Sequence, residues 1–173
     1  MTAYIGYHGT DKNAAKLIVD SQKFRPSLED DEWLGKGVYF YWDIDDARWW
    51  CTDYKKLDAY AVLQSRLTAG VVVDLVHSRS DQENFRIFCD KVKSKSERLP
   101  NGKKRRNYMS LALELMIRLK PPDIIIGAFD ENRKFWYKAK DLKDKFPVVI
   151  SQIQICVLNA GCISDTYIYE EVG

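Results

Sequence analysis

The sequence lacks the long apolar runs and the targeting signals that several classes of protein need. No run approaches the roughly 18–20 apolar residues that span a bilayer, so we expect no membrane association. The first ten residues, MTAYIGYHGT, contain neither a charged segment nor a long apolar core. This argues against a secretory signal and for a cytoplasmic protein. The sequence also has no internal repeat and no low-complexity tract.

Histidine and cysteine are both scarce. His8 and His77 are the two histidines, and the four cysteines form no Cys-x-x-Cys pair. A structural zinc site usually needs such closely spaced ligands, so we expect no bound metal. Cys156 and Cys162 are near enough in sequence for a disulfide, but a protein without an export signal favours reduced thiols.

The composition is that of a globular protein whose charge is unevenly distributed. The 173 residues, 46% hydrophobic and 30% charged, suit one soluble domain over residues 1–173. The net charge is +2, yet the segment Lys91–Arg106 alone holds eight basic residues and one acidic residue. Segregated positive charge indicates a polyanionic partner, with nucleic acid first. A solvated lysine-rich loop is the alternative, and the composition does not decide between the two.

Apolar periodicity and turn residues predict a mixture of helices and strands. Helices are predicted over Lys12–Ser21 with Asp11 as its N-cap, and over Asp43–Tyr54, Asp81–Lys93 and Met109–Leu119. Strands are predicted over Ala3–His8, the second half of Leu34–Trp42, Val71–Val76, Asp123–Ala128, Val148–Leu158 and Thr166–Glu171. Because strands and helices do not alternate regularly, the pattern favours an α+β fold over a doubly wound sheet.

Aromatic residues are concentrated between Trp33 and Trp50, a stretch that holds four of the five tryptophans. Such a tract beside two glycines can be core, or it can line a flat slot for a planar ligand. We expect Tyr41, Trp42 and Trp50 to lie in the core, because alternate residues of a strand point to opposite faces.

Two short motifs stand in order near the N-terminus. The first is Tyr7-His8-Gly9-Thr10, and the second is Gly35-Lys36-Gly37-Val38-Tyr39-Phe40, followed by a predicted helix that contains Asp46-Ala47. Over residues 7–50 this arrangement resembles the catalytic half of the diphtheria-toxin-like and poly-ADP-ribose-polymerase-like ADP-ribosyltransferases. The resemblance implies a split β-sheet core with flanking helices, and an enzyme that consumes NAD as a co-substrate.

The resemblance also implies roles for single residues. His8 would hydrogen-bond the 2′-hydroxyl of the nicotinamide ribose, and Gly9 would bond the carboxamide through its backbone. Thr10 stands where a hydroxyl contacts the cofactor, and Tyr39 would stack on the nicotinamide ring. Trp49 stands where the family often has the second aromatic residue of that stack.

Two positions depart from the family's pattern. Asp46 replaces a carboxamide-binding serine, although a carboxylate can still accept from an amide NH₂ group. The family's catalytic glutamate begins a late strand, and the best match, Gln154-Ile-Cys-Val-Leu-Asn159, has Gln154 there. Gln152, on the same face of that strand, could assist. Glu170 or Glu171 could instead supply a carboxylate, and both alternatives stay open.

These residues predict a mono-ADP-ribosyltransferase that modifies nucleic acid, reached through Lys91–Arg106, or else protein. A domain of this size resembles bacterial or phage toxins, which often have an antitoxin or inhibitor protein as partner. One alternative is an inactive module that binds NAD or ADP-ribose, which the missing glutamate supports. Another is an NAD-dependent RNA 2′-phosphotransferase, which needs more cleft histidines than His8 and His77 provide.

Overall fold

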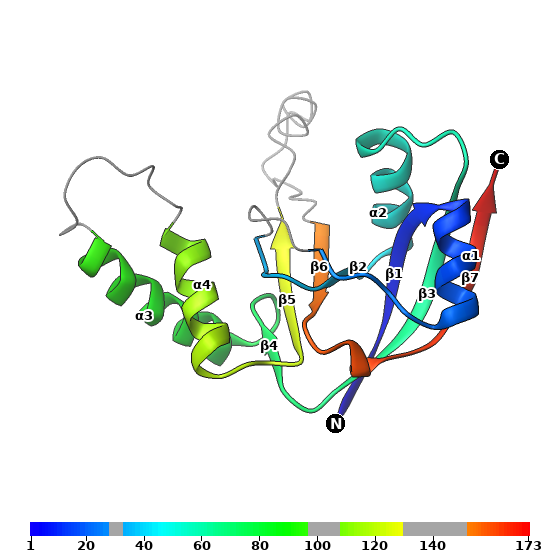
Figure 1. Cartoon of the computed structure of the whole chain (residues 1–173). Coiled ribbons are helices and arrows are strands. Elements are labelled where there is room, and N and C mark those ends of the chain that lie inside the picture. The colour runs from blue at the N-terminus through cyan, green and yellow to red at the C-terminus, as the bar shows by residue number, and fades with distance from the viewer. Residues whose placement is uncertain (28–32, 97–107, 130–151) are drawn as a thin grey trace, which may run out of the picture.

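A mixed seven-stranded sheet with flanking helices forms the fold, in a computed structural model that describes residues 1–27, 33–96, 108–129 and 152–173. Within these ranges the strands are β1 (Thr2–Asp11), β2 (Val38–Tyr41), β3 (Tyr60–Ala69), β4 (Val72–Asp74), β5 (Ile124–Phe129), β6 (Gln152–Val157) and β7 (Ile163–Val172). The helices are α1 (Lys12–Ser21), α2 (Ile44–Trp49), α3 (Arg79–Ser96) and α4 (Tyr108–Leu119), with a π-helical turn over Trp50–Tyr54 and a 3-10 turn over Ala160–Cys162. The α+β class is confirmed (Figure 1).

The sheet, in the order β4-β5-β6-β2-β1-β3-β7, is nearly divided in two between β2 and β1. β1 pairs with β3 along its whole length, from Thr2↔Ala69 to Asp11↔Tyr60. Between β1 and β2 the ladder consists of one position, Tyr7↔Tyr41. We therefore distinguish a first half-sheet, β4-β5-β6-β2, from a second half-sheet, β1-β3-β7. We call the junction at Tyr7 and Tyr41 the split.

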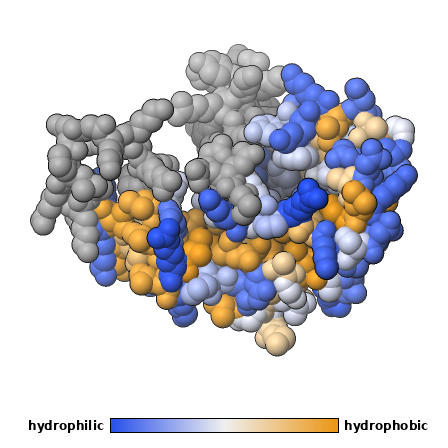
Figure 2. Space-filling model, viewed as in Figure 1, coloured by the Kyte–Doolittle hydropathy of each residue, from blue (hydrophilic) through white to orange (hydrophobic). Residues whose placement is uncertain are grey.

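Side chains from both half-sheets meet in one core cluster. Its fully buried members come from four strands and include Val38, Phe40, Leu67, Ile124, Ile126, Ile155 and Val157. Because the two half-sheets bury these residues together, they cannot separate at the split without exposing that core to water. Figure 2 shows hydrophobic residues as a band across the lower middle of one face, and hydrophilic residues predominating near α1 at the right.

Helix α1 covers one face of the second half-sheet, where Ala15 packs against Ala61 and Leu63. The Asp11 carboxylate accepts hydrogen bonds from the backbone N–H groups of Asn13 and Ala14. This satisfies donors that the first turn of a helix cannot pair internally. The predicted helix and its cap are confirmed to the residue.

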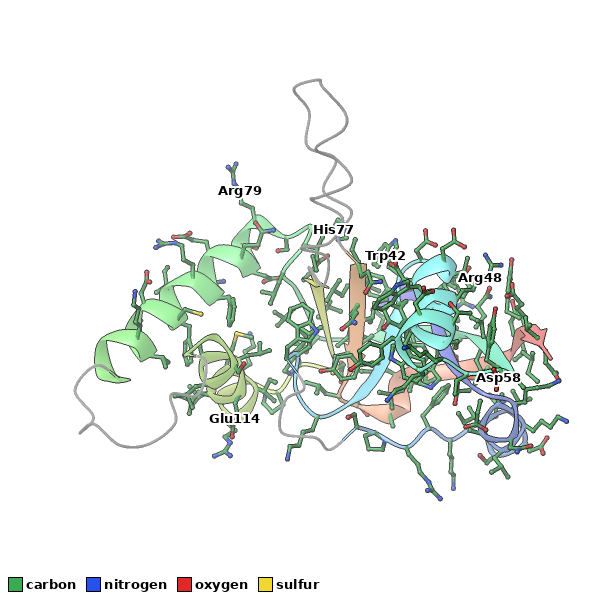
Figure 3. All side chains as sticks on the ribbon, turned by 90° about the horizontal axis from the view of Figure 1, so that it is seen from above. Trp42, Arg48, Asp58, His77, Arg79 and Glu114 are labelled. Carbon is green, nitrogen blue, oxygen red and sulfur yellow. The ribbon has the colours of Figure 1, made fainter. Side chains whose placement is uncertain are left out.

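The opposite face of the second half-sheet is covered by α2 and the π-helical turn, where Ala47 and Cys51 pack near Val62. The single helix predicted over Asp43–Tyr54 is therefore two consecutive helical segments. In Figure 3 the chain from Trp42 through Arg48 runs along this side of the molecule.

Several other element boundaries differ from the sequence prediction. The predicted Asp81–Lys93 helix begins two residues earlier and continues to Ser96, so it includes the first residues of the basic segment. Residues 97–106 of that segment lie outside the described residues. Strand β3 was not predicted at all. The predicted Val148–Leu158 strand is described from Gln152 onward.

All four cysteines are free and buried, as expected for reduced thiols. No helix within the described residues is long and apolar enough to cross a membrane. Those residues also contain no group of three or more possible metal ligands.

Candidate functional site

His8 lies at the split and connects the two half-sheets. Its Nδ1 is 2.8 Å from the backbone carbonyl oxygen of Tyr39 on β2. A carbonyl only accepts, so Nδ1 carries the hydrogen and Nε2 keeps its lone pair. The ring stands edge-on to Phe24 at 5.2 Å and also contacts Phe40. Burial lowers the pKa of His8, and the bond to Tyr39 opposes this shift only in part. His8 is thus an oriented, neutral hydrogen-bond acceptor.

Gly9 is required by the close approach of α2 to β1. A Cβ atom at this position would lie 2.6 Å from the Ala47 carbonyl oxygen and 2.6 Å from the Cys51 sulfur. The glycine of the first motif therefore has a packing role in addition to the role that the resemblance gives it. Thr10, the next residue, is half-buried.

Tyr39 is fixed by the chain that precedes it. Its hydroxyl donates to the Gly35 carbonyl at 2.9 Å and accepts from the Leu34 N–H at 3.1 Å. Gly35 has φ of +102°, which favours glycine, and a Cβ on Gly37 would lie 2.6 Å from the Val157 carbonyl oxygen. The second motif thus holds the half-buried Tyr39 ring in one orientation.

Gln154 lies on β6 directly opposite Tyr41. Its Oε1 accepts a hydrogen bond of 2.8 Å from the Trp33 indole N–H. With this oxygen engaged, the NH₂ group is the end of the side chain that a ligand can use. Two residues earlier, Gln152 is 6% exposed, and its Oε1 has no hydrogen-bond partner among the residues that the structure describes. A buried amide oxygen without a partner is costly, which makes Gln152 a ligand-binding candidate beside Gln154.

The register shows which of these side chains share a face. Tyr39 lies opposite Cys156, and Tyr41 opposite Gln154, so Tyr39 and Gln154 lie on one face of the first half-sheet. His8 packs with Phe40 and therefore lies on the other face, joined to Tyr39 through the backbone bond. The structure brings the three predicted catalytic residues to the split, but their side chains do not point to one atom.

Asp46 lies in the first turn of α2 and is half-buried. Burial, together with the smaller effect of the neighbouring carboxylates of Asp43 and Asp45, raises its pKa to about 6. Those two neighbours are occupied, because Asp43 caps α2 and Asp45 pairs with Arg48. Within the described residues the Asp46 carboxylate has no hydrogen-bond or ionic partner. A half-buried acid with a raised pKa and no partner is a functional-site candidate.

Trp49, the predicted second face of a ring slot, is half-buried on α2. Its aromatic neighbour is Tyr54, with ring centroids 6.1 Å apart. The structure does not place its ring against Tyr39, so the slot between these two rings stays a prediction.

Glu170 and Glu171, the alternative carboxylates, are both engaged. Glu170 accepts from the guanidinium of Arg48, with Nε–oxygen distances of 2.9 and 3.1 Å. Glu171 pairs with Lys12 at 2.7 Å, and this bond holds the pKa of Glu171 below its usual range. These contacts fasten β7 to α2 and α1, which favours Gln154 for the third position.

The structure corrects the prediction for Trp42. Tyr41 is buried as expected, and Trp50 is half-buried, but Trp42 is 40% exposed. Its ring contacts His77, for which the sequence predicts no role, with ring centroids 5.2 Å apart. Nothing in the sequence indicates this contact, because 34 residues lie between the two positions.

Comparisons with known proteins leave the family of this chain open. No known protein family matches the sequence, and no solved structure matches the fold. One similar protein is an uncharacterized protein of Methanocaldococcus jannaschii, 51% identical over 35 residues. That match covers 20% of this chain and 16% of the length of the archaeal protein.

Proposed function

We propose that this protein is a mono-ADP-ribosyltransferase that cleaves NAD and transfers ADP-ribose to a macromolecular acceptor, in the first place nucleic acid. The observation that carries the proposal is the split. The His-Gly motif of β1 and the Gly-x-Gly-Val-Tyr-Phe motif of β2 lie on its two sides, joined by the bond from His8 to Tyr39. Motifs far apart in sequence thus meet where the sheet is joined by a single paired position.

The residues at the split suit a reaction that depends on positioning and electrostatics. In the proposed reaction the bond between the ribose C1′ and the nicotinamide nitrogen breaks, and nicotinamide leaves with the electron pair. C1′ then bonds to an oxygen or nitrogen of the acceptor, which loses its proton to water. Oriented groups can accelerate such a step by fixing the ribose and the ring and stabilising developing charge.

Each candidate residue has a part in this proposal. The bare Nε2 of His8 would accept from the 2′-hydroxyl of the ribose. The Tyr39 ring would stack on nicotinamide, and Asp46 would accept from the carboxamide NH₂ group. Gln154 would donate its NH₂ group to the ribose from the face opposite His8, so the ribose would extend across the split. Beside it Gln152 Oε1, which has no partner among the described residues, would accept from a hydroxyl group.

Because a glutamine cannot act as a general base, the acceptor must be nucleophilic without deprotonation by the enzyme. An amino group of a nucleobase or a carboxylate meets this condition. The positive segment Lys91–Arg106 favours nucleic acid between them. Of this segment, Lys91 and Lys93 lie on the last turns of α3 with exposed side chains.

The test is release of nicotinamide from NAD, together with transfer of ³²P-labelled ADP-ribose to RNA, DNA or protein. His8→Ala should abolish both signals, whereas Arg118→Ala, a control at an exposed residue of α4 that pairs with Glu114, should leave nicotinamide release unchanged. If the wild-type protein neither releases nicotinamide nor labels any of the three acceptors, the proposal is wrong.

A second candidate function is an NAD- or ADP-ribose-binding module without turnover. The engagement of Gln154 by Trp33 favours it, because the residue that would act on the ribose is partly occupied. Calorimetric binding of NAD with no release of nicotinamide would select this function over the transferase.

A further inference from the structure

Trp42 forms an exposed aromatic surface that the proposed NAD chemistry does not use. It directly follows β2, and the residue is 40% exposed. Tyr4 of β1 meets it edge-on at 5.8 Å, and the His77 ring lies 5.2 Å away at an interplanar angle of 42°. A large ring supported on two sides and open on another is suited to stacking with a planar ligand.

His77, beside this ring, is held in one orientation by Asp74. Its Nδ1 is 3.0 Å from Asp74 Oδ2, and its side chain is 51% exposed. The other carboxylate oxygen of Asp74 accepts the backbone N–H groups of Val76 and His77. In the neutral ring, Nδ1–H donates to Asp74 and Nε2 is left as an acceptor. The turn that Asp74 stabilises explains the position of His77. It does not explain why the ring of the exposed Trp42 lies against His77.

A positively charged side chain follows His77 in the chain. Arg79 begins α3 two residues after His77, is exposed, and makes no ion pair within the described ranges. Figure 3 shows Trp42 and His77 as neighbours, with the Arg79 side chain extending away from the fold. The nearby acids are engaged, because Asp43 caps α2 and Asp81 accepts the backbone N–H of Asp74. Arg79 is therefore available to an anion.

The same two strands carry this surface and the split. Tyr4 precedes His8 by four residues on β1, and Trp42 follows Tyr39 by three on β2, which corresponds to about 10–13 Å along each strand. A polymer bound at Trp42 would therefore reach the split within a few of its units. α3, which begins at Arg79, leads directly into the basic segment Lys91–Arg106.

We propose that Trp42, His77 and Arg79 bind single-stranded nucleic acid as the acceptor of the transferase. One base stacks on Trp42, His77 Nε2 accepts from an amino or imino group at the edge of that base, and Arg79 neutralises a phosphate. Stacking requires an unpaired base, which is why a single strand is favoured over a duplex. The role as acceptor site rests on the proposed function, whereas the binding itself does not.

The test is fluorescence anisotropy with a labelled 12-nucleotide RNA or DNA of mixed sequence, without NAD. Trp42→Leu should weaken binding of the single strand about tenfold, the range expected for loss of one base–aromatic stack. Trp42→Phe, which keeps a ring, should bind within about threefold of the wild type. Arg79→Gln should lower the slope of log affinity against log salt by about one.

The matched control is Tyr169→Leu, because Tyr169 is a similarly exposed aromatic residue on β7 that lies against Tyr7, away from Trp42. It should leave binding unchanged. If Trp42→Leu binds as tightly as the wild type, or if duplex binds as tightly as single strands, the inference is overturned. If the protein labels a protein acceptor and binds no oligonucleotide, it is also overturned.

The two proposals fail separately. Binding of oligonucleotide through Trp42 without release of nicotinamide would refute the transferase and leave the nucleic-acid surface standing. Release of nicotinamide without any oligonucleotide binding would refute the nucleic-acid surface and leave the transferase standing.

Discussion

A methyl group added at Gly9 should destabilise the protein by overpacking the contact between β1 and α2. In Gly9→Ala the new Cβ would lie 2.6 Å from the Ala47 carbonyl oxygen and 2.6 Å from the Cys51 sulfur. The sulfur is on a side chain and can move, but the carbonyl belongs to α2, so the helix itself must shift. Overpacking of this kind costs about 1–3 kcal/mol. For a chain of this length the cost corresponds to a decrease in Tm of roughly 3–10 °C.

The measurement is thermal unfolding followed by circular dichroism, with Gly70→Ala as the matched control. At Gly70 the nearest atom to a new Cβ is an Asp123 carboxylate oxygen at 3.4 Å, so the methyl group is accommodated there. Gly9→Ala combined with Cys51→Ala should recover part of the loss, because one of the two clashes is removed. If Gly9→Ala melts at the same temperature as the wild type, α2 does not pack on β1 as the structure shows.

Four further predictions concern the polar residues near the split. The raised pKa of Asp46 means that the folded state binds more protons than the unfolded state between about pH 4 and 6, so stability falls as pH rises through this window. In urea unfolding, Asp46→Asn should therefore have a higher free energy of unfolding than the wild type at pH 7, and an equal one at pH 4. Equal free energies of unfolding at both pH values would contradict the burial of Asp46. Glu170→Gln, which weakens a partly exposed pair with Arg48, should lower stability by at most about 1 kcal/mol and leave nicotinamide release intact. Gln152→Met should stabilise the free protein by about 1 kcal/mol, because it removes an unpartnered buried oxygen, yet should weaken NAD binding in calorimetry. Gln154→Glu should raise the rate of nicotinamide release about tenfold or more, because a carboxylate stabilises positive charge at C1′, and an unchanged rate would remove this residue from the site.

Local signals in the sequence were sufficient for α1 and for the glycines of the second motif. Asp11 caps α1 through hydrogen bonds to residues within three positions, so neighbouring residues alone determine where that helix begins. The motif glycines likewise have local reasons, such as the positive φ of Gly35.

The first half of strand β3 carries no periodic signal because both of its faces are covered. Leu63 packs beneath α1 on one face, and Val62 packs near α2 on the other. A strand buried on both faces shows no alternation of apolar and polar residues. Over residues 64–69 buried positions do alternate with more exposed ones such as Arg66, and this short alternation is the local signal for the strand that supports β1 and hence His8.

The candidate site could be predicted only in part, because its residues are placed by contacts between distant parts of the chain. The motifs indicated His8 and Tyr39, but the bond that joins them depends on the pairing of β1 and β2, which is a tertiary contact. The engagement of Gln154 by Trp33 and the exposure of Trp42 beside His77 likewise arise from residues far apart in the chain. Such contacts leave no trace in local spacing.

The most direct test of the proposed function is the rate of nicotinamide release from NAD by the purified protein, compared between the wild type, His8→Ala and the control Arg118→Ala on α4. The neutral, oriented imidazole at the split should be needed, so His8→Ala should lose release while Arg118→Ala retains it. Release that is equal in the wild type and His8→Ala, or absent from the wild type, would contradict a transferase site built on His8.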